Sequence, residues 1–163
     1  NSGQRGFWVA PMSSAEFNDI TTARLQVEAK ALRMSILSAD DAWRTAVESA
    51  YSNLLNVEGS MGDDRQQVSA IWEQSNRTFH SALLSRCPSR WLLRFVEMLA
   101  EQSERYRRCA LVQHAVPIEK LMAEHQAIRD AAVANHANLA AELLRIHVEN
   151  AASAIRRKLF PDE

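Results

Sequence analysis

The sequence is poor in residues that interrupt regular structure and in residues that cross-link or anchor a chain. Glycine and proline number four each in 163 residues, which leaves little room for the frequent tight turns of an all-β fold. The two cysteines, Cys87 and Cys109, form neither a CxxC pair nor a disulfide framework, which favours a reducing, cytoplasmic environment. No apolar run approaches the roughly 18 residues that span a bilayer, so we expect a soluble protein without a membrane partner.

Charge of either sign is also not in excess. Lys and Arg together number 19 and Asp and Glu together 20, for a formal net charge of −1. A domain that holds duplex DNA by itself usually has a basic surplus, so we expect no specific DNA binding by this chain alone. What is present is an ordinary globular composition, 47% hydrophobic and 24% charged, at the length of one domain.

Beyond residue 12 the apolar residues recur at helical spacing. Capping residues, breakers and glycines divide this pattern into helices joined by short loops, and we expect the divisions at residues 13–16, 38–41, 58–64, 87–89, 117 and 135–138. The inward-facing residues are expected to include Ile71, Phe95 and Leu139. The sequence therefore predicts an all-α fold, an antiparallel bundle of about six helices.

Three histidines occupy positions where helix packing favours apolar side chains. His125 and His147 lie within the inward rows of the last two helices, and His80 follows Asn76 by four residues on the third. Burying three separate imidazoles is costly, whereas one divalent metal ion satisfies all three. The spacing leaves two hypotheses open, a shared metal site or three hydrogen-bonded core histidines. The other two histidines are expected at the surface: His114 and His136.

Two arginines are candidates for binding an anion. Arg24 interrupts the apolar stripe of the first helix, with Glu28 one turn later. It is either the partner of Glu28 in an internal ion pair or a planar guanidinium offered to an anion inside the bundle. In the charged run at residues 101–108, Arg105 is the residue expected to turn inward, because it continues the row of residues 95, 98 and 102.

Taken in order, these residues resemble the FCD domain, the effector-binding C-terminal domain of FadR-subfamily GntR transcription regulators. The resemblance covers about residues 13–159 and rests on Arg24-x3-Glu28, Asn76-Arg-Thr-Phe-His80, Glu124-His125-x2-Ile128 and Ile146-His147. Residues 3–11 resemble the closing strand of that family's winged helix-turn-helix, with a looser first glycine spacing. We therefore expect residues 1–12 to be a remnant of the wing strand and linker of a DNA-binding domain absent from this chain, and residues 13–163 to be the ligand-binding domain.

The resemblance implies a homodimer and a divalent metal ion held by one aspartate and three histidines beside a pocket for a small organic acid. The corresponding ligands in this sequence are Asn76, His80, His125 and His147. Asn76 departs from the usual aspartate, and its amide oxygen adds no charge, so we expect zinc but leave nickel and manganese open. Arg24 and Arg105 match arginines that hold an effector carboxylate.

Two other functions fit parts of the pattern. A metal-dependent hydrolase also uses three histidines and an open coordination position. However, Arg129 stands where an HExxH motif needs its second histidine, and Glu124 is expected to point away from the site. The third option is a helical dimerisation module without metal. We favour a sensor and no enzymatic activity, and the sequence offers these apolar residues for a dimer surface: Leu25, Leu32, Leu93 and Val96.

Overall fold

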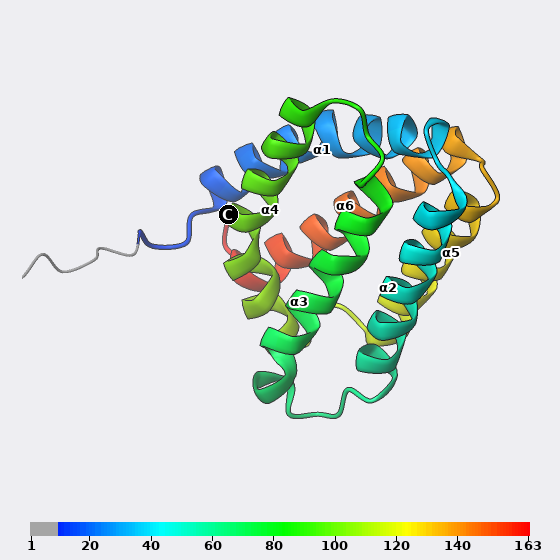
Figure 1. Ribbon diagram of the computed structural model, residues 1–163. Coiled ribbons are helices and arrows are strands. Elements are labelled where there is room, and N and C mark those ends of the chain that lie inside the picture. The colour runs from blue at the N-terminus through cyan, green and yellow to red at the C-terminus, as the bar shows by residue number, and fades with distance from the viewer. Residues whose placement is uncertain (1–9) are drawn as a thin grey trace, which may run out of the picture.

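Figure 1 shows the chain as a computed structural model, which describes residues 10–163. These residues form six helices and no strand, which confirms the all-α prediction. The helices are α1 (Ser14–Leu37), α2 (Asp41–Gly59), α3 (Arg65–Leu84), α4 (Arg90–Val112), α5 (Ile118–Val133) and α6 (Ala137–Leu159). The predicted wing remnant at residues 1–12 lies largely outside the described residues.

The helices pack against neighbours in sequence and, more extensively, against helices that are distant in the chain. Helix α2 pairs with α3 and α5, and α5 pairs with α6. Helix α1 lies across the upper ends of α3 and α4 in Figure 1 and packs most extensively along α6. One region of the bundle interior is therefore surrounded by α1, α3, α4 and α6. Helix α5 borders the same region on another side.

The predicted capping residues start the helices where the sequence indicates. Ser13, Asp40 and Ser89 each accept a hydrogen bond from the backbone N–H three residues later, at 3.2, 2.7 and 3.2 Å. His114 and Asn135 adopt positive φ angles of 55° and 61° just after the ends of α4 and α5, the left-handed conformation that ends many helices. His114 and His136 are exposed, as predicted.

The main apolar core lies between the helices and includes Trp43, Val47, Leu54, Phe79, Leu83, Ile128 and Leu144. Three residues predicted to face inward do not: Ile71, Phe95 and Leu139 are 57%, 48% and 51% exposed. On α4 the reason is the helix phase, because Val96 is the buried position and its neighbour Phe95 is turned about 100° away. Val96 and Leu32 belong to the core, so they are unavailable for the dimer surface that the sequence suggested.

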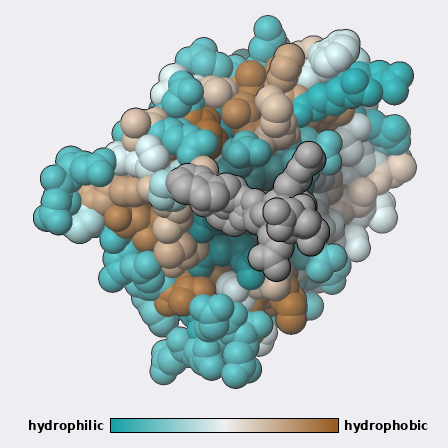
Figure 2. All heavy atoms as spheres, turned by 90° about the vertical axis from the view of Figure 1, so that its left-hand side faces the viewer, coloured by the Kyte–Doolittle hydropathy of each residue, from teal (hydrophilic) through white to brown (hydrophobic). Residues whose placement is uncertain are grey.

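A second, smaller core joins the start of α1 to the end of α6. The ring of Tyr106 on α4 lies between Phe17 and Phe160, at centroid distances of 4.8 and 6.3 Å. Figure 2 shows the face that lies on the left of Figure 1, where polar and apolar side chains are interspersed. None of the described helices combines the length and the apolar character needed to cross a membrane.

Candidate metal and effector site

Three histidines from three helices converge inside the bundle. The potential ligand nitrogens of His80 on α3, His125 on α5 and His147 on α6 all lie within 4.8 Å of one another. The ring of His125 is fully buried and that of His147 nearly so, whereas His80 is half-buried. The structure thus brings together the three histidines that the sequence selected, at a spacing that one metal ion can bridge.

His147 is oriented by a carboxylate on the neighbouring helix. Its Nδ1 lies 2.6 Å from Oε2 of Glu124, and the Asn150 side chain donates a hydrogen bond to Oε1 of Glu124 at 2.7 Å. Burial would raise the pKa of Glu124, but the hydrogen bonds from His147 and Asn150 bring it below its usual value. The ionised carboxylate accepts a hydrogen bond from the Nδ1–H group. The Nε2 lone pair of a neutral His147 is therefore free for a metal ion.

A second buried carboxylate stands beside His125. Oε1 of Glu58, at the end of α2, lies 3.0 Å from His125 Nδ1 and accepts a hydrogen bond from Trp72 Nε1 at 3.2 Å. The His125 ring is not angled for a linear hydrogen bond, and neither of its nitrogens has a partner that satisfies both distance and angle. A fully buried imidazole without partners is costly, so an ion or water at Nε2 would relieve the penalty.

Burial and neighbouring charges favour the neutral form of two of the three rings. Burial, with the neighbouring histidines and the more distant Arg24 and Arg107, holds the pKa of His80 well below its usual value. Burial also lowers the pKa of His147, against the opposing effect of its hydrogen bond with Glu124. The neutral imidazole is the form that binds metal ions, so the donor set of this chain fits a divalent cation.

A cavity of about 250 Å³ opens beside the histidines and extends between α1, α3, α4 and α6. Its polar lining includes Arg24, Glu28, Asn76, Arg77, His80, Glu97, Arg107 and His147, and its apolar lining includes Leu84, Leu93, Val96 and Val148. Asn76 is 7% exposed and stands one turn before His80 in the cavity wall, where the sequence predicted a fourth ligand.

Arg24 lies in this cavity as a member of an ion pair. Its guanidinium donates to both carboxylate oxygens of Glu28, at 2.6 and 3.2 Å. The ion pair left open by the sequence is therefore present. Arg24 also lines the space beside the histidines, and its binding of an anion there stays a prediction. The pair brings no net charge to the cavity.

The model of the FCD domain matches residues 19–150, most of the chain. This chain belongs to the FCD domain family. The resemblance found in the sequence is thereby confirmed, and the matched range includes Arg24, Asn76 and the three clustered histidines.

Two curated relatives and one solved structure resemble this FCD domain. The uncharacterised HTH-type transcriptional regulator BphR of Paraburkholderia xenovorans LB400 is 41% identical over 94% of the chain and 62% of the relative. The HTH-type transcriptional repressor GlaR of Escherichia coli K12 is 30% identical over 89% of the chain and 66% of the relative. The chain therefore spans less than two thirds of the length of either. A GntR-family regulator from Pseudomonas syringae pv. tomato DC3000 shares the fold, with a TM-score of 0.75 and 24% identity over 93% of this chain and 60% of that one.

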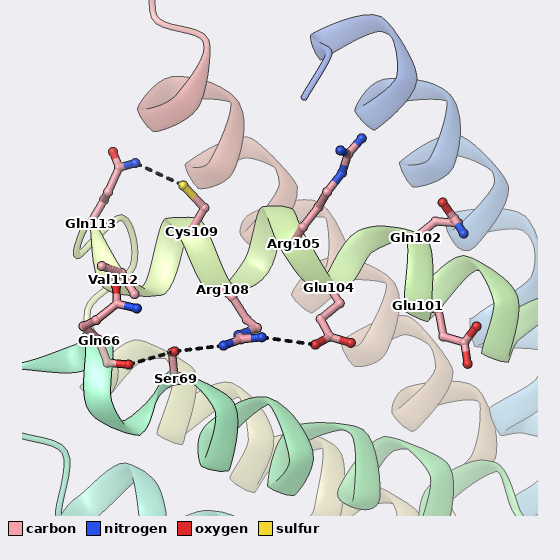
Figure 3. A pocket seen from close by; sticks show the side chains of 10 residues that line it. All are labelled: Gln66, Ser69, Glu101, Gln102, Glu104, Arg105, Arg108, Cys109, Val112 and Gln113. Carbon is pink, nitrogen blue, oxygen red and sulfur yellow. Dashed lines mark hydrogen bonds and ion pairs between the residues drawn. The ribbon is translucent and has the colours of Figure 1, made fainter. Parts of the chain in front are cut away.

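Arg105, the second predicted anion-binding residue, lies outside the histidine cavity of this FCD domain. Its guanidinium hydrogen-bonds the Ala10 carbonyl, Glu16 at 3.1 Å and the Tyr106 hydroxyl at 3.3 Å. Figure 3 shows Arg105 extending from α4 toward α1, at the edge of an open surface pocket between α3 and α4. The row used to predict its direction, residues 95, 98 and 102, is itself exposed.

The arginine of α4 that does line the cavity is Arg107. It donates to Glu73 through Nε at 3.1 Å and through Nη2, and to the Ala100 carbonyl at 2.9 Å. The sequence contained a signal for it: Arg107 stands four residues after Ser103 and three before Ala110, both of which are buried. A correct helix phase for α4 would have selected Arg107 instead of Arg105.

The two glutamates that stand beside the histidines were also missed. Glu124 was expected to point away from the site, and this was wrong, because its neighbour in space is His147 on α6 rather than His125 beside it in sequence. Glu58 was assigned to a loop, but it ends α2 and is only 2% exposed. Nothing in the local sequence distinguishes either glutamate from a surface residue.

Proposed function

We propose that this FCD domain is the effector-sensing and dimerisation domain of a GntR-type DNA-binding transcription regulator, and that it binds a small carboxylate at an internal divalent metal site. The observation that carries the proposal is the convergence of three histidine ligand atoms within 4.8 Å around a buried His125 whose nitrogens lack partners. The relatives BphR and GlaR are named as HTH-type transcriptional regulators, which supports a sensory role over an enzymatic one.

His80, His125 and His147 would hold the ion, with the Asn76 amide oxygen as a fourth ligand. Three neutral nitrogens and an amide favour zinc, and nickel and manganese remain alternatives. When bound, the ion would supply positive charge and open coordination positions to an anionic effector. Glu58 and Glu124 would fix the rings of His125 and His147, as carboxylates commonly do behind metal-bound histidines.

An anionic effector follows from the open coordination positions of the ion and from the guanidinium groups in the cavity wall. Arg24 and Arg107 are each paired with one glutamate. Glu58 and Glu124 stand behind two of the histidines, so the open positions and the guanidinium donors, and not a net positive charge, would select an anion. A small mono- or dicarboxylate would compensate the ion at one end and accept hydrogen bonds from a guanidinium at the other. Arg107 replaces Arg105 beside Arg24 in this proposal, because Arg107 lines the cavity and Arg105 does not.

A homodimer would be formed through the exposed side of α4. Trp91, Phe95 and Met98 are 66%, 48% and 50% exposed and follow one another at helical spacing on one face. Arg94 covers part of the Trp91 ring at 5.0 Å, and Trp91 lies 6.3 Å from Phe95. An exposed row of large apolar side chains is typical of a protein interface.

Metal analysis combined with a ligand screen tests the proposed function. The purified protein should contain about one divalent ion per chain, and single alanine variants of the three histidines should lose it, while His136→Ala, an exposed control, should retain it. In a panel of small carboxylic acids a true effector at a hundredfold excess over Kd adds about 2.7 kcal/mol of stability, which chelation of the metal should abolish. Full metal content in all three variants would contradict the proposal.

A further inference from the structure

A second, smaller cavity adjoins the histidine cavity inside the bundle. It measures about 50 Å³ and shares four lining residues with the larger one: Asn76, Arg107, His147 and Ala151. Its remaining lining residues are all apolar: Trp72, Ala110, Leu111, Val116, Leu121 and Ile155. We call this space the apolar recess. Arg107 and His147 therefore stand at the boundary between a polar cavity and a carbon-lined one.

The recess is unusual for a protein core. Interiors are packed to nearly crystalline density, and apolar voids larger than a water molecule are few and cost stability. Here most of the lining side chains are almost completely buried, and Ala110 and Ala151 leave space where a larger residue would fill it. An apolar cavity does not hold ordered water well, because water needs two to four polar partners.

From these observations we infer that the effector is a carboxylate with a compact aliphatic substituent, and that this substituent occupies the apolar recess. The inference rests on the proposed function for the carboxylate end. Hydrogen bonds to Glu73 and to the Ala100 carbonyl hold Arg107 at the boundary between the two cavities. Its guanidinium can therefore hydrogen-bond the effector carboxylate while the carbon chain extends into the recess. A cavity of about 150 Å³ holds the six carbon atoms of benzene, so at about 25 Å³ per carbon atom the recess accommodates about two carbon atoms.

A series of 2-hydroxy acids with one common head group tests this size limit. Hydroxyacetate, 2-hydroxypropanoate, 2-hydroxy-3-methylbutanoate and 2-hydroxy-4-methylpentanoate keep a carboxylate and hydroxyl that can chelate a metal ion and add successive apolar carbons. Calorimetric titration of the metal-loaded protein should show affinity rising about fourfold per added carbon, the value for transfer of a methylene from water, until about two carbons fill the recess. Acids with longer chains should gain nothing further.

Two variants change the recess without touching a proposed ligand. Ala110→Val adds two carbon atoms to its wall and should remove the gain from the aliphatic substituent while hydroxyacetate binds as before. Leu121→Ala enlarges the recess and should shift the preferred chain to a longer one, which provides a test if Ala110→Val does not fold. Ala123→Val, at an exposed position of α5 that lines neither cavity, is the control and should bind the series as the parent does.

The possible results of these titrations distinguish a failure of this inference from a failure of the proposed function on which it rests. Affinity that grows with the chain and is lost in Ala110→Val supports the recess as the aliphatic subsite. Metal-dependent binding of hydroxyacetate with no gain along the series, or a gain that both variants leave unchanged, overturns the inference and leaves the proposed function intact. If no acid of the series or of the wider panel binds in a metal-dependent manner, the proposed function and this inference both fail.

Discussion

Glu124 lies beside His125 in sequence but hydrogen-bonds His147 on the next helix, with 2.6 Å between Glu124 Oε2 and His147 Nδ1. Residues 124 and 125 thus support the same site from two directions. The carboxylate orients one imidazole, and the adjacent histidine supplies another. This arrangement links α5 and α6 through the site, so the metal affinity should depend on a residue that is not itself a ligand.

We expect Glu124→Gln to weaken metal binding by about 10–100-fold, because the His147 ring loses the charged acceptor that fixes its tautomer. Competition with a chromophoric chelator measures the change. Glu142→Gln removes an exposed glutamate on α6 that pairs only with Arg145, and it should leave the affinity unchanged. Equal affinities for the two variants would exclude an orienting role for Glu124.

Asn76→Asp should raise the affinity for a divalent ion, since it replaces a neutral oxygen donor by a carboxylate at the position one turn before His80. The same competition assay reports the change, and Asn138→Asp, exposed on α6, is the matched control. If Asn76→Asp does not bind metal more tightly than the control, Asn76 is not a ligand.

Arg24→Ala should weaken binding of the acid effector by about 10–100-fold while the metal content stays intact, because a hydrogen bond to a charged group is lost inside the cavity. Arg105→Ala should leave acid binding unchanged, since Arg105 contacts the segment before α1 instead. Calorimetric titration of both variants with the acid measures the two effects. Weaker acid binding in Arg105→Ala together with unchanged binding in Arg24→Ala would instead assign the anion site to Arg105.

Arg107 and Glu73 form a buried ion pair, with side-chain exposures of 10% and 3%. Arg107→Met should reduce the free energy of unfolding by about 3–5 kcal/mol, because it leaves the Glu73 carboxylate buried without its partner. Adding Glu73→Gln should recover most of this loss. Urea denaturation of the single and double variants measures the effect, and additive losses in the double variant would refute this account of the pair.

Phe95→Glu should dissociate the homodimer by placing charge in the exposed apolar row of α4. Ile71→Glu introduces the same charge at an exposed apolar position of α3 and should leave the dimer unaffected. Light scattering at micromolar concentration reads out both variants. A parent protein that is monomeric under these conditions would remove dimerisation from the proposed function.

The fold could be predicted from the sequence because its determinants are local. Caps such as Ser13 and Asp40, few glycines and prolines, and periodic apolar residues are properties of short segments. The histidines were also predictable, since His125 and His147 interrupt apolar rows that must pack inward. Ile71 and Phe95 were misassigned because neighbouring apolar positions leave the phase of a helix ambiguous by one residue.

The supporting residues of the site could not be predicted in the same way. Glu58 and His125 lie on different helices and are 67 positions apart, and Glu73 and Arg107 are 34 positions apart. A glutamate or arginine on an amphipathic helix is usually solvated, and only the tertiary packing shows that these four side chains are partners. The inward direction predicted for Arg105 was wrong for a different reason, because the phase of α4 was assigned incorrectly.

Anomalous diffraction from crystals of the purified chain, collected at the absorption edge of the metal identified by fluorescence, tests the central claim most directly. The account predicts one anomalous peak per chain between His80, His125 and His147, at about 2.0–2.1 Å from a nitrogen of each ring if the ion is zinc. The absence of a peak at this position in protein prepared without chelators, or a peak only elsewhere, would contradict it.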